Sequence, residues 1–549
     1  MIDIREARED DAAVIAEIFH ASYGDDYTFP EFYDQEFLKK LIFSDETLVL
    51  VAEDTDSGRV LGTASVVLEV GALTDLVGEF GRLAVHPDGR GMGLGNKLME
   101  GRLERVRDRL HVGLVDGRLT HPFTQKISQS HGFAPVGFLP MMVQFGDSRE
   151  SLALLVQYFG DALDLRRNHP RIVPEAYHLA VAAMENIGLH PDVIVDEEAA
   201  AYPHVEGFEI QELSADGYSD LLRIERGRVS RREIFGPLSL HYGFFKIKAQ
   251  NSNYLIARQD GHIVGAIGFT HDKLERNVRV FEMIHLDDEV IRFLLEELEK
   301  RYLGWNVAVV QIGVSAHATC MQRTLVELGF LPAAYVPAHA FHRVERIDVI
   351  TFLRLLEPLD LGDLVLISPT KEIVELVIKG FARREVFPEL LAAVDKIDLF
   401  SGLSKEQTMR VAGICGHATF CPGERIFARG ESSDEMFLLL EGEVERVLAD
   451  GCSVGLTGAG ECLGEVALLT GAAHAATATA QREVHAGVIR KQDLDALVRQ
   501  RPDIGVVLYR NLAEGVGSKL RQFDLDHVAE SERHPEDHAG ASTGAADSP

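Results

Sequence analysis

Apolar and polar positions alternate through the first part of the chain in a pattern that predicts a mixed sheet with helices. The alternation predicts strands at residues 47–54, 59–70, 78–87, 112–120 and 132–138. After a glycine-rich turn, Met99, Leu103, Val106 and Leu110 recur at the spacing of one helix face. Residues 1–145 are therefore expected to form one mixed-sheet α/β unit.

The same order of elements begins again near residue 206. A hairpin around Asp260-Gly261 precedes a strand, a helix at 287–302 and a further strand. The segment LGFLPAAYVP (328–337) also resembles HGFAPVGFLP (131–140). This repetition predicts an internal duplication, with a second mixed-sheet unit over residues 206–357.

The segment between the two units, residues 146–205, is expected to be a helical connector. Helices are predicted near Ser148–Phe159 and Glu175–Asn186. Residues 358–392 are expected to form a helical linker.

Residues 393–524 change to short strands separated by glycine turns, which predicts a β-roll or jelly-roll barrel. Flanking helices are expected at Lys405–Cys415 and Lys491–Leu520. The tail, 525–549, has no periodicity and is expected to be disordered. The fold class expected is a multidomain α+β chain, with tandem mixed-sheet α/β units followed by this barrel.

Composition narrows the possible partners. The 549 residues carry a formal net charge of −31, which disfavours nucleic-acid binding through clustered basic side chains. No uncharged apolar run reaches the length of a membrane span, and the acidic start lacks the features of a secretion signal. The five cysteines include no CxxC pair, which predicts reduced thiols in a cytoplasm and no structural zinc or other metal.

The glycine-rich segment Arg90-Gly91-Met92-Gly93-Leu94-Gly95-Asn96 follows a strand and opens a helix. Positions without side chains allow backbone amides to converge on an anion, and the helix N-terminus adds partial positive charge. The alternative is a plain strand–helix turn. The spacing fits neither the dinucleotide-binding pattern nor the P-loop.

The longer string GRLAVHPDGRGMGLGNKLM (81–99) resembles motif A of the GNAT acetyltransferase superfamily, with Arg90, Gly93 and Gly95 at the signature positions. The resemblance implies acetyl-CoA or another acyl-CoA as cofactor. The pyrophosphate would then bind at the turn residues Arg90, Gly91, Met92, Gly93, Leu94, Gly95 and Asn96. The pantetheine arm would lie along Leu83, Ala84 and Val85.

The chemistry that this resemblance implies is direct attack of a neutral amine on the thioester, which needs a base, an oxyanion donor and an acid. Glu79 is the expected base, with a solvent-facing strand carboxylate as the alternative. Leu83 or a neighbour would supply the oxyanion N–H. Relatives commonly place a tyrosine as the acid four residues before a Gly-Phe pair, where this chain has Ser128. His121, His131 or water are the other candidates, and a structural role for His121 is the alternative.

The second unit has no glycine turn at the matching position. Its helix instead opens with Asp287-Asp288-Glu289, which would repel a pyrophosphate. We therefore expect residues 206–357 to be a degenerate GNAT-like repeat that supports the first unit or forms a wall of the substrate site.

The strings PGERIFARGESSDEMFLLLEGEVERVL (422–448) and LGEVALLTGAAHAATATA (463–480) resemble the cyclic nucleotide-binding domain. The resemblance implies that Glu465 binds the ribose 2′-hydroxyl of a cyclic nucleotide such as cyclic AMP. The phosphate cradle would be formed by Gly464, Val466, Ala475 and Ala476.

The family's phosphate-binding arginine is replaced by His474, nine residues after Glu465. Histidine is mostly neutral near pH 7 and cannot form the bidentate contact. Loss of such a bond costs on the order of 1.5–3 kcal/mol, or roughly ten- to a hundredfold in affinity. The barrel is therefore predicted either to bind a cyclic nucleotide or to remain as a docking or dimerisation module.

Together these features predict an acyl-CoA-dependent N-acyltransferase controlled by a cyclic nucleotide module. The acceptor would be a protein lysine, by analogy with bacterial lysine acetyltransferases, which combine the same two modules in the reverse order. An amine on a small molecule is the alternative acceptor. The alternative is a sensor or scaffold that binds a nucleotide or CoA and catalyses nothing.

Overall fold

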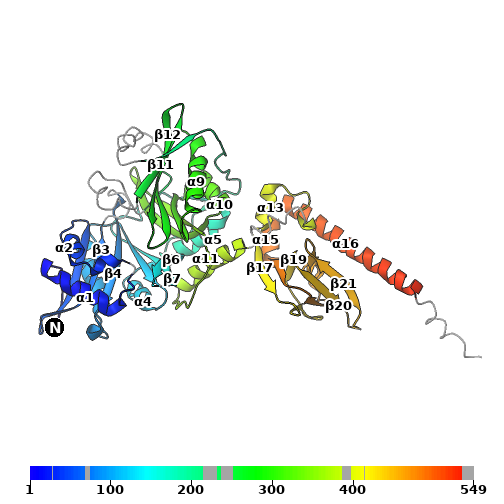
Figure 1. Cartoon of the computed structure of the whole chain (residues 1–549), viewed down its shortest axis with the longest axis horizontal. Helices are drawn as coiled ribbons and strands as arrows, with labels where there is room; N and C mark the ends of the chain where they lie inside the picture. Colours follow the sequence, from blue (N-terminus) through cyan, green and yellow to red (C-terminus); the bar gives the residue numbers. More distant parts are fainter. Residues whose placement is uncertain are drawn as a thin grey trace, which may run out of the picture. The chain divides into compact units, whose positions relative to one another are not determined.

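A computed structural model of the chain describes residues 1–27, 29–68, 75–146, 148–213, 232–236, 252–385, 397–412, 414–449 and 451–533. The chain divides into two compact parts, Met1–Ile378 and Lys379–Pro549, and each is described by itself (Figure 1). In the described residues, no helix combines the length and apolar character needed to cross a membrane.

The first half of the first part is a seven-stranded stretch of sheet in the order β1-β2-β3-β4-β5-β7-β6. Only β4 and β5 run parallel. The strands are β1 (Ile2–Glu6), β2 (Thr47–Asp54), β3 (Arg59–Val67), β4 (Val77–Val85), β5 (Val112–Arg118), β6 (Ala134–Phe145) and β7 (Ser148–Tyr158). The helices are α1 (Ala12–Tyr23), α2 (Gln35–Ile42), α3 (Leu94–Val106) and α4 (Phe123–Ser130).

Helices cover both faces of this sheet, and β2 has apolar side chains on both faces. Val49 and Val51 pack with the side chains of α1 and α2, whereas Leu50 and Ala52 pack with Leu94 of α3. Successive strand residues point to opposite faces. The continuous apolar run of β2 therefore reflects a strand buried on both sides.

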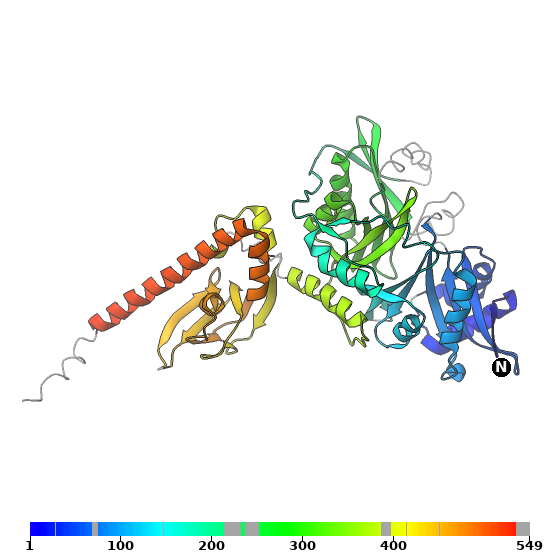
Figure 2. The ribbon, with the colours of Figure 1, turned by 180° about the vertical axis from the view of Figure 1, so that it is seen from behind.

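The second half repeats this arrangement in the same sheet, in the order β15-β16-β14-β13-β12-β11-β10. Its strands are β10 (Glu209–Glu212), β11 (Ser252–Gln259), β12 (His262–Asp272), β13 (Asn277–His285), β14 (Val309–Ser315), β15 (Leu331–His342) and β16 (Glu345–Leu355). Its helices are α9 (Glu289–Tyr302) and α10 (Thr319–Glu327). Figure 2 shows this half, in green, beside the blue first half.

The two halves meet at matching positions of the repeated segment. The β6–β15 pairing joins Gly137 to Ala334, which occupy the same place in GFAPVGF and GFLPAAY. A Cβ on Gly137 would lie only 2.2 Å from that of Ala334, so the contact requires glycine. The backbone details also repeat, since Met141 and Ala338 both have positive φ. The predicted duplication is thus visible in the strand order and in the backbone.

The segment expected as a helix near Ser148–Phe159 is instead strand β7, and that prediction was wrong. β7 lies between β5 and β6 and pairs with both. Its run Leu152–Val156 is apolar throughout because both faces are buried, and a short apolar run does not distinguish strand from helix. The helix expected at Glu175–Asn186 is present as α5 (Tyr177–Asn186).

Other connecting elements are short. β8 (Arg171–Ile172) and β9 (Ile194–Val195) form a small parallel pair, and α11 (Thr370–Glu385) lies within the expected helical linker. Residues 386–392 of that linker lie outside the described residues.

The second part contains two four-stranded sheets, in the orders β17-β24-β19-β22 and β18-β23-β20-β21. Its strands are β17 (Cys415–Phe420), β18 (Arg425–Phe427), β19 (Glu435–Glu441), β20 (Glu443–Val447), β21 (Ser453–Gly458), β22 (Cys462–Leu463), β23 (Thr477–Ala480) and β24 (Val484–Arg490). Its helices are α13 (Lys405–Ala412), α14 (Glu465–Thr470), α15 (Lys491–Gln500) and α16 (Pro502–Arg533). The expected fold class is confirmed.

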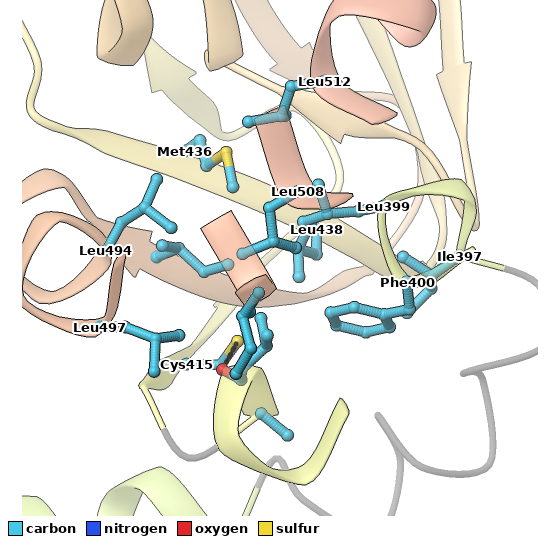
Figure 3. Close-up of a cluster of buried hydrophobic side chains, with 14 of the residues drawn as sticks. Ile397, Leu399, Phe400, Cys415, Met436, Leu438, Leu494, Leu497, Leu508 and Leu512 are labelled. Atoms are coloured by element: carbon cyan, nitrogen blue, oxygen red, sulfur yellow. Dashed lines mark hydrogen bonds between the residues drawn. The ribbon is translucent and has the colours of Figure 1, made fainter. Parts of the chain in front are cut away.

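The helices of this part close the β-roll through an apolar cluster. Leu494 of α15 and Leu508 and Leu512 of α16 pack against Met436 and Leu438 of β19 (Figure 3). The expected helical stretch 491–520 is two helices, because Pro502 favours an extended residue before it and starts the second helix.

The disorder expected from residue 525 is wrong for the first residues of the tail. Helix α16 continues to Arg533, so residues 525–533 are helical, and the remainder of the tail lies outside the described residues. Alanine, glutamate and arginine favour a helix even where no apolar period is visible.

Candidate active site

The glycine turn forms the N-terminus of α3, as the sequence predicts. Gly91 and Gly93 have φ values of +81° and +70°, which side-chain-bearing residues rarely adopt. Gly95 has another role, because a Cβ there would lie 2.7 Å from Cδ1 of Ile127 on α4. No side chain caps α3. The first-turn N–H groups, which have no partner within a helix, are therefore available to an anion.

Strand β4, which leads to this turn, contains a β-bulge. Thr63 faces Ala84 and Ser65 faces Gly81, so β4 has one residue more than β3 over this stretch. Arg82, within the bulge, has a φ of +52°. The bulge lies directly before Leu83, Ala84 and Val85, the positions expected to follow a pantetheine arm.

A buried arginine of α3 holds the bulge in place. Nη1 of Arg102 donates to the carbonyl oxygens of Ser65 and Gly81, each at 3.2 Å. Arg102 is 1% exposed, and removal from water lowers its pKa to about 9. Helix α3 thus carries the glycine turn at one end and fixes β4 further along.

Strands β4 and β5 separate beside the bulge. They pair only from Val77–Glu79 with Val112–Leu114, whereas β5 continues beside β7 to Arg118. Within the described residues, β4 has no strand partner on this side after Glu79. Such an edge offers main-chain donors and acceptors to an extended ligand.

Glu79 lies at the point of separation and forms an ion pair. Its Oε1 is 2.9 Å from Nη1 of Arg82, and its side chain is 31% exposed. Glu79 stands opposite Leu114 in the strand register, so Asp116, two residues further along β5, is on the same face of the sheet.

Asp116 is a functional candidate that the sequence analysis missed. Solvent reaches its side chain, yet the surrounding protein displaces much of the water around it. This desolvation and, next, the negative charge of Glu79 raise the pKa of Asp116 to about 7. An acidic residue inside the apolar strand VGLVDGR was the signal that could have identified it.

The other predicted catalytic side chains lie on and before α4. Ser128 is fully buried and its hydroxyl has no hydrogen-bond partner among the described residues. His121 is partly buried, and burial lowers its pKa. In that part of the chain, neither side chain makes a hydrogen bond or ion pair with Glu79. Their roles stay predictions, and the burial of Ser128 argues against direct contact with an incoming thioester.

The matching helix of the second half, α9, has a carboxylate at its N-terminus. The carboxylate of Asp287 accepts a hydrogen bond from the Glu289 N–H at 3.1 Å, so the first turn of α9 has an internal acceptor. Asn277 pairs with Val309 as Val77 pairs with Val112. This register makes Arg279 the counterpart of Glu79.

In the second part of the chain, Glu465 opens α14 and is only 6% exposed. Its Oε1 accepts a hydrogen bond from Nζ of Lys519 on α16 at 2.9 Å. The preceding Gly464 has a φ of +83°. The residue expected to bind a ribose hydroxyl is therefore already paired with a cation.

His474 stacks on Phe427, with ring centroids 3.7 Å apart and planes 9° apart. Its Nε2 is buried and has no partner among the described residues. Burial lowers its pKa, which favours the neutral ring near pH 7. Val466 and Ala475 are exposed and Ala476 is partly exposed, so these cradle residues are accessible.

No group of three or more His, Cys, Asp or Glu side chains that could hold a metal ion occurs among the described residues.

Comparison with known proteins matches two segments of the chain. Residues 45–135 match the acetyltransferase (GNAT) domain and residues 417–501 match the cyclic nucleotide-binding domain. The cyclic AMP receptor protein of Thermus thermophilus is 28% identical over 138 residues, which are 23% of this chain. The chain spans 59% of the length of that relative.

Two solved structures are each similar to part of the chain. A GNAT-superfamily phosphinothricin acetyltransferase from Sinorhizobium meliloti, in complex with AcCoA, has 20% identity. The similarity covers 29% of this chain and 89% of that chain, with a TM-score of 0.26. A cyclic nucleotide-binding domain from Methylobacillus flagellatus has 21% identity over 30% of this chain and 89% of that chain, with a TM-score of 0.25.

Both resemblances are therefore confirmed at the level of domains. The chain contains a GNAT acetyltransferase domain and, towards its carboxyl end, a cyclic nucleotide-binding domain.

Proposed function

We propose that this protein is an N-acyltransferase that transfers the acetyl group of acetyl-CoA, or another acyl group from its CoA thioester, to an amine. The observation that carries the proposal is the pairing of an uncapped glycine turn with a bulged, partly unpaired β4 in the GNAT-matching segment. The first-turn amides of α3 would hold the pyrophosphate. Leu83, Ala84 and Val85 would hold the pantetheine arm.

When bound, the cofactor supplies an activated acyl carbon. The chain itself has to orient this carbon, donate a main-chain N–H to the developing oxyanion and remove a proton from the amine. The bulge interrupts the regular hydrogen-bond ladder of the strand around Leu83. A main-chain N–H there would be suited to donate to the oxyanion. Glu79 and Asp116 share the face on which the proton acceptor is needed.

The acceptor is an amine on a small molecule or a protein lysine. The net charge of −31 favours a cationic acceptor through long-range attraction. We place the reaction in the cytoplasm, where the five cysteines would stay reduced.

A pair of matched glycine variants tests cofactor binding. Gly93→Ala forces a side chain into positive φ at the turn, and Gly58→Ala does the same in the β2–β3 turn, with φ values of +70° and +68° and open space at both. We expect calorimetry to show at least a tenfold loss of acetyl-CoA affinity for Gly93→Ala alone. Equal affinity in both variants would contradict the proposed pyrophosphate site.

Transfer itself is tested by incubating the protein with radiolabelled acetyl-CoA and a panel of amines and lysate proteins. A labelled acceptor supports the enzyme. Tight acetyl-CoA binding without any labelled acceptor would instead support the non-catalytic sensor or scaffold.

We further propose that a cyclic nucleotide, such as cyclic AMP, binds beside Glu465 and controls the transferase. The support is the match to the domain over residues 417–501 and the buried position of Glu465 at the start of α14. Calorimetry with cyclic AMP and assays of transfer with and without it test this. Binding that Glu465→Ala does not weaken, or a rate that cyclic AMP does not change, would count against it.

A further inference from the structure

The two halves of the first part hold each other through reciprocal contacts around their β-hairpins. Nη1 of Arg149, on β7, donates to the carbonyl oxygen of Glu275 in the turn before β13 at 2.8 Å. In the opposite direction, the carboxylate of Asp75, just before β4, accepts the N–H of Phe341 on β15 at 3.0 Å. Each half therefore fixes the start of the other half's central strand.

We call the region where the two halves meet the junction. Some buried side chains there have polar atoms without a hydrogen-bond partner among the described residues. Glu275 has a side chain that is 5% exposed, and its Oε2 accepts hydrogen bonds from Asn277 at 2.7 Å and Arg279 at 3.3 Å. Its other carboxylate oxygen, Oε1, has no partner among the described residues, and the same is true of Nε of Arg279. Buried polar atoms are nearly always hydrogen-bonded, so these atoms indicate a ligand.

Asp116 lies on the same face of the sheet as Glu79, beside the point where β4 and β5 separate. Glu79 and Arg82 act on Asp116 from β4, and Arg279 and Glu275 act on it from the second half. Asp272 and Arg149 also act on Glu275, so the carboxylates around these residues outnumber the guanidinium groups by four to three, a negative balance that suits a cation.

We propose that the acceptor amine binds at this junction, with Asp116 as the proton acceptor and with Glu275 and Arg279 of the second half as its recognition residues. The inference rests on the proposed acyltransferase function. The acceptor is then a cationic amine that carries a further hydrogen-bonding group, such as a polyamine or a lysine in a peptide. The second half has lost the cofactor site and contributes to acceptor binding instead.

The ammonium gives one proton to the carboxylate of Asp116 and becomes a neutral amine. The nitrogen attacks the thioester carbonyl carbon, the C–N bond forms and the C–S bond breaks. The nitrogen's second proton passes through water to the departing thiolate, and Asp116 releases its proton to solvent.

Glu79 takes a different role in this scheme from the one that the sequence predicts. Its ion pair with Arg82 occupies it, and its charge raises the pKa of Asp116. Glu79 is therefore a positioning residue that sets the pH at which Asp116 becomes a base.

The test follows thiol release from acetyl-CoA by the full-length protein between pH 5.5 and 8.5, with spermidine or a single-lysine peptide as acceptor. We expect kcat/KM to fall below about pH 7. Asp116→Asn should lose about 100- to 10,000-fold in rate and keep its acetyl-CoA affinity, since a positioned general base contributes that much. Asp45→Asn, at an exposed aspartate, is the matched control and should match the unmodified protein.

Two further variants test the separate roles of Glu79 and Glu275. Glu79→Gln should shift the acidic limb to lower pH and keep a measurable rate, because removal of its charge lowers the pKa of Asp116. Glu275→Gln should raise the KM for the amine at least fivefold and leave the acetyl-CoA dissociation constant unchanged.

The inference is overturned if Asp116→Asn transfers within threefold of the control, or if Glu79→Gln abolishes transfer while Asp116→Asn does not. An amine KM that Glu275→Gln leaves unchanged would remove the second half from acceptor binding. Absence of transfer to either amine in the unmodified protein would overturn this assignment for both acceptors. The proposed function would fall as well only if acetyl-CoA did not bind, or if no other amine and no lysate protein accepted the acetyl group.

Discussion

His474 bears on the proposed binding of a cyclic nucleotide, because the resemblance implies a permanently charged arginine at this position. The sequence alone shows the replacement, and the physical cost of a neutral ring follows from it. The sequence does not show that the ring stacks on Phe427 or that Glu465 is paired with Lys519. These contacts depend on residues far apart in the chain.

We predict that His474→Arg strengthens the binding of cyclic AMP by about ten- to a hundredfold, the value of one charge-assisted contact to the phosphate. Isothermal titration calorimetry at pH 7.5 measures it. Because the unmodified ring gains charge as the pH falls, the advantage of arginine should shrink at pH 5.5. An unchanged affinity would show that the phosphate does not approach position 474.

Helix α3 and the bulged strand β4 are joined by hydrogen bonds from Arg102, so they form one structural unit. The glycine turn was predictable from the motif, because its glycines adopt positive φ and a short local sequence is enough to indicate such a turn. Arg102 and Asp116 were not singled out, because their importance comes from tertiary contacts: one guanidinium fixes two carbonyl groups, and one carboxylate is crowded by distant strands. Strand β7 was predicted as a helix because its pairing with β5 and β6, which buries it on both faces, is also a tertiary contact.

We predict that Arg102→Met disturbs the bulge and lowers kcat/KM for acetyl-CoA by about tenfold or more, whereas far-ultraviolet circular dichroism stays close to that of the unmodified protein. Methionine fills a similar volume but cannot donate to the carbonyl oxygens of Ser65 and Gly81, which become unsatisfied. Arg107→Met, at an exposed position of the segment after α3, provides the comparison. Equal kinetics in the two variants would show that the bulge does not need this clamp.

At the scale of the whole molecule, the duplication in the first part was predictable from repeated element order, and the second half's lack of a glycine turn was visible in the sequence. The reciprocal hairpin contacts were not, because they join turns that the sequence separates widely. His339 lies near Asp75 and Arg346, where the two halves meet, and its pKa is changed by its burial. Burial lowers its pKa to about 4.

A histidine with a folded pKa below its unfolded value binds fewer protons in the folded state. The free energy of unfolding should therefore fall as the pH drops from about 6.5 to about 4, and it should be at its full value above that window. Thermal unfolding across this range measures the effect. We expect His339→Gln to flatten the dependence, and an equally steep slope in this variant would assign the acid sensitivity to other groups.

The ion pair between Lys519 and Glu465 has a consequence for any effector. If a cyclic nucleotide binds as proposed, its ribose hydroxyl would compete with the lysine ammonium for one carboxylate, and the ligand would weaken the hold on α16. By thermodynamic reciprocity, anything that draws α16 away must tighten the ligand by the same factor. A protein that captures the freed helix would therefore act as a co-agonist of the nucleotide, without touching it.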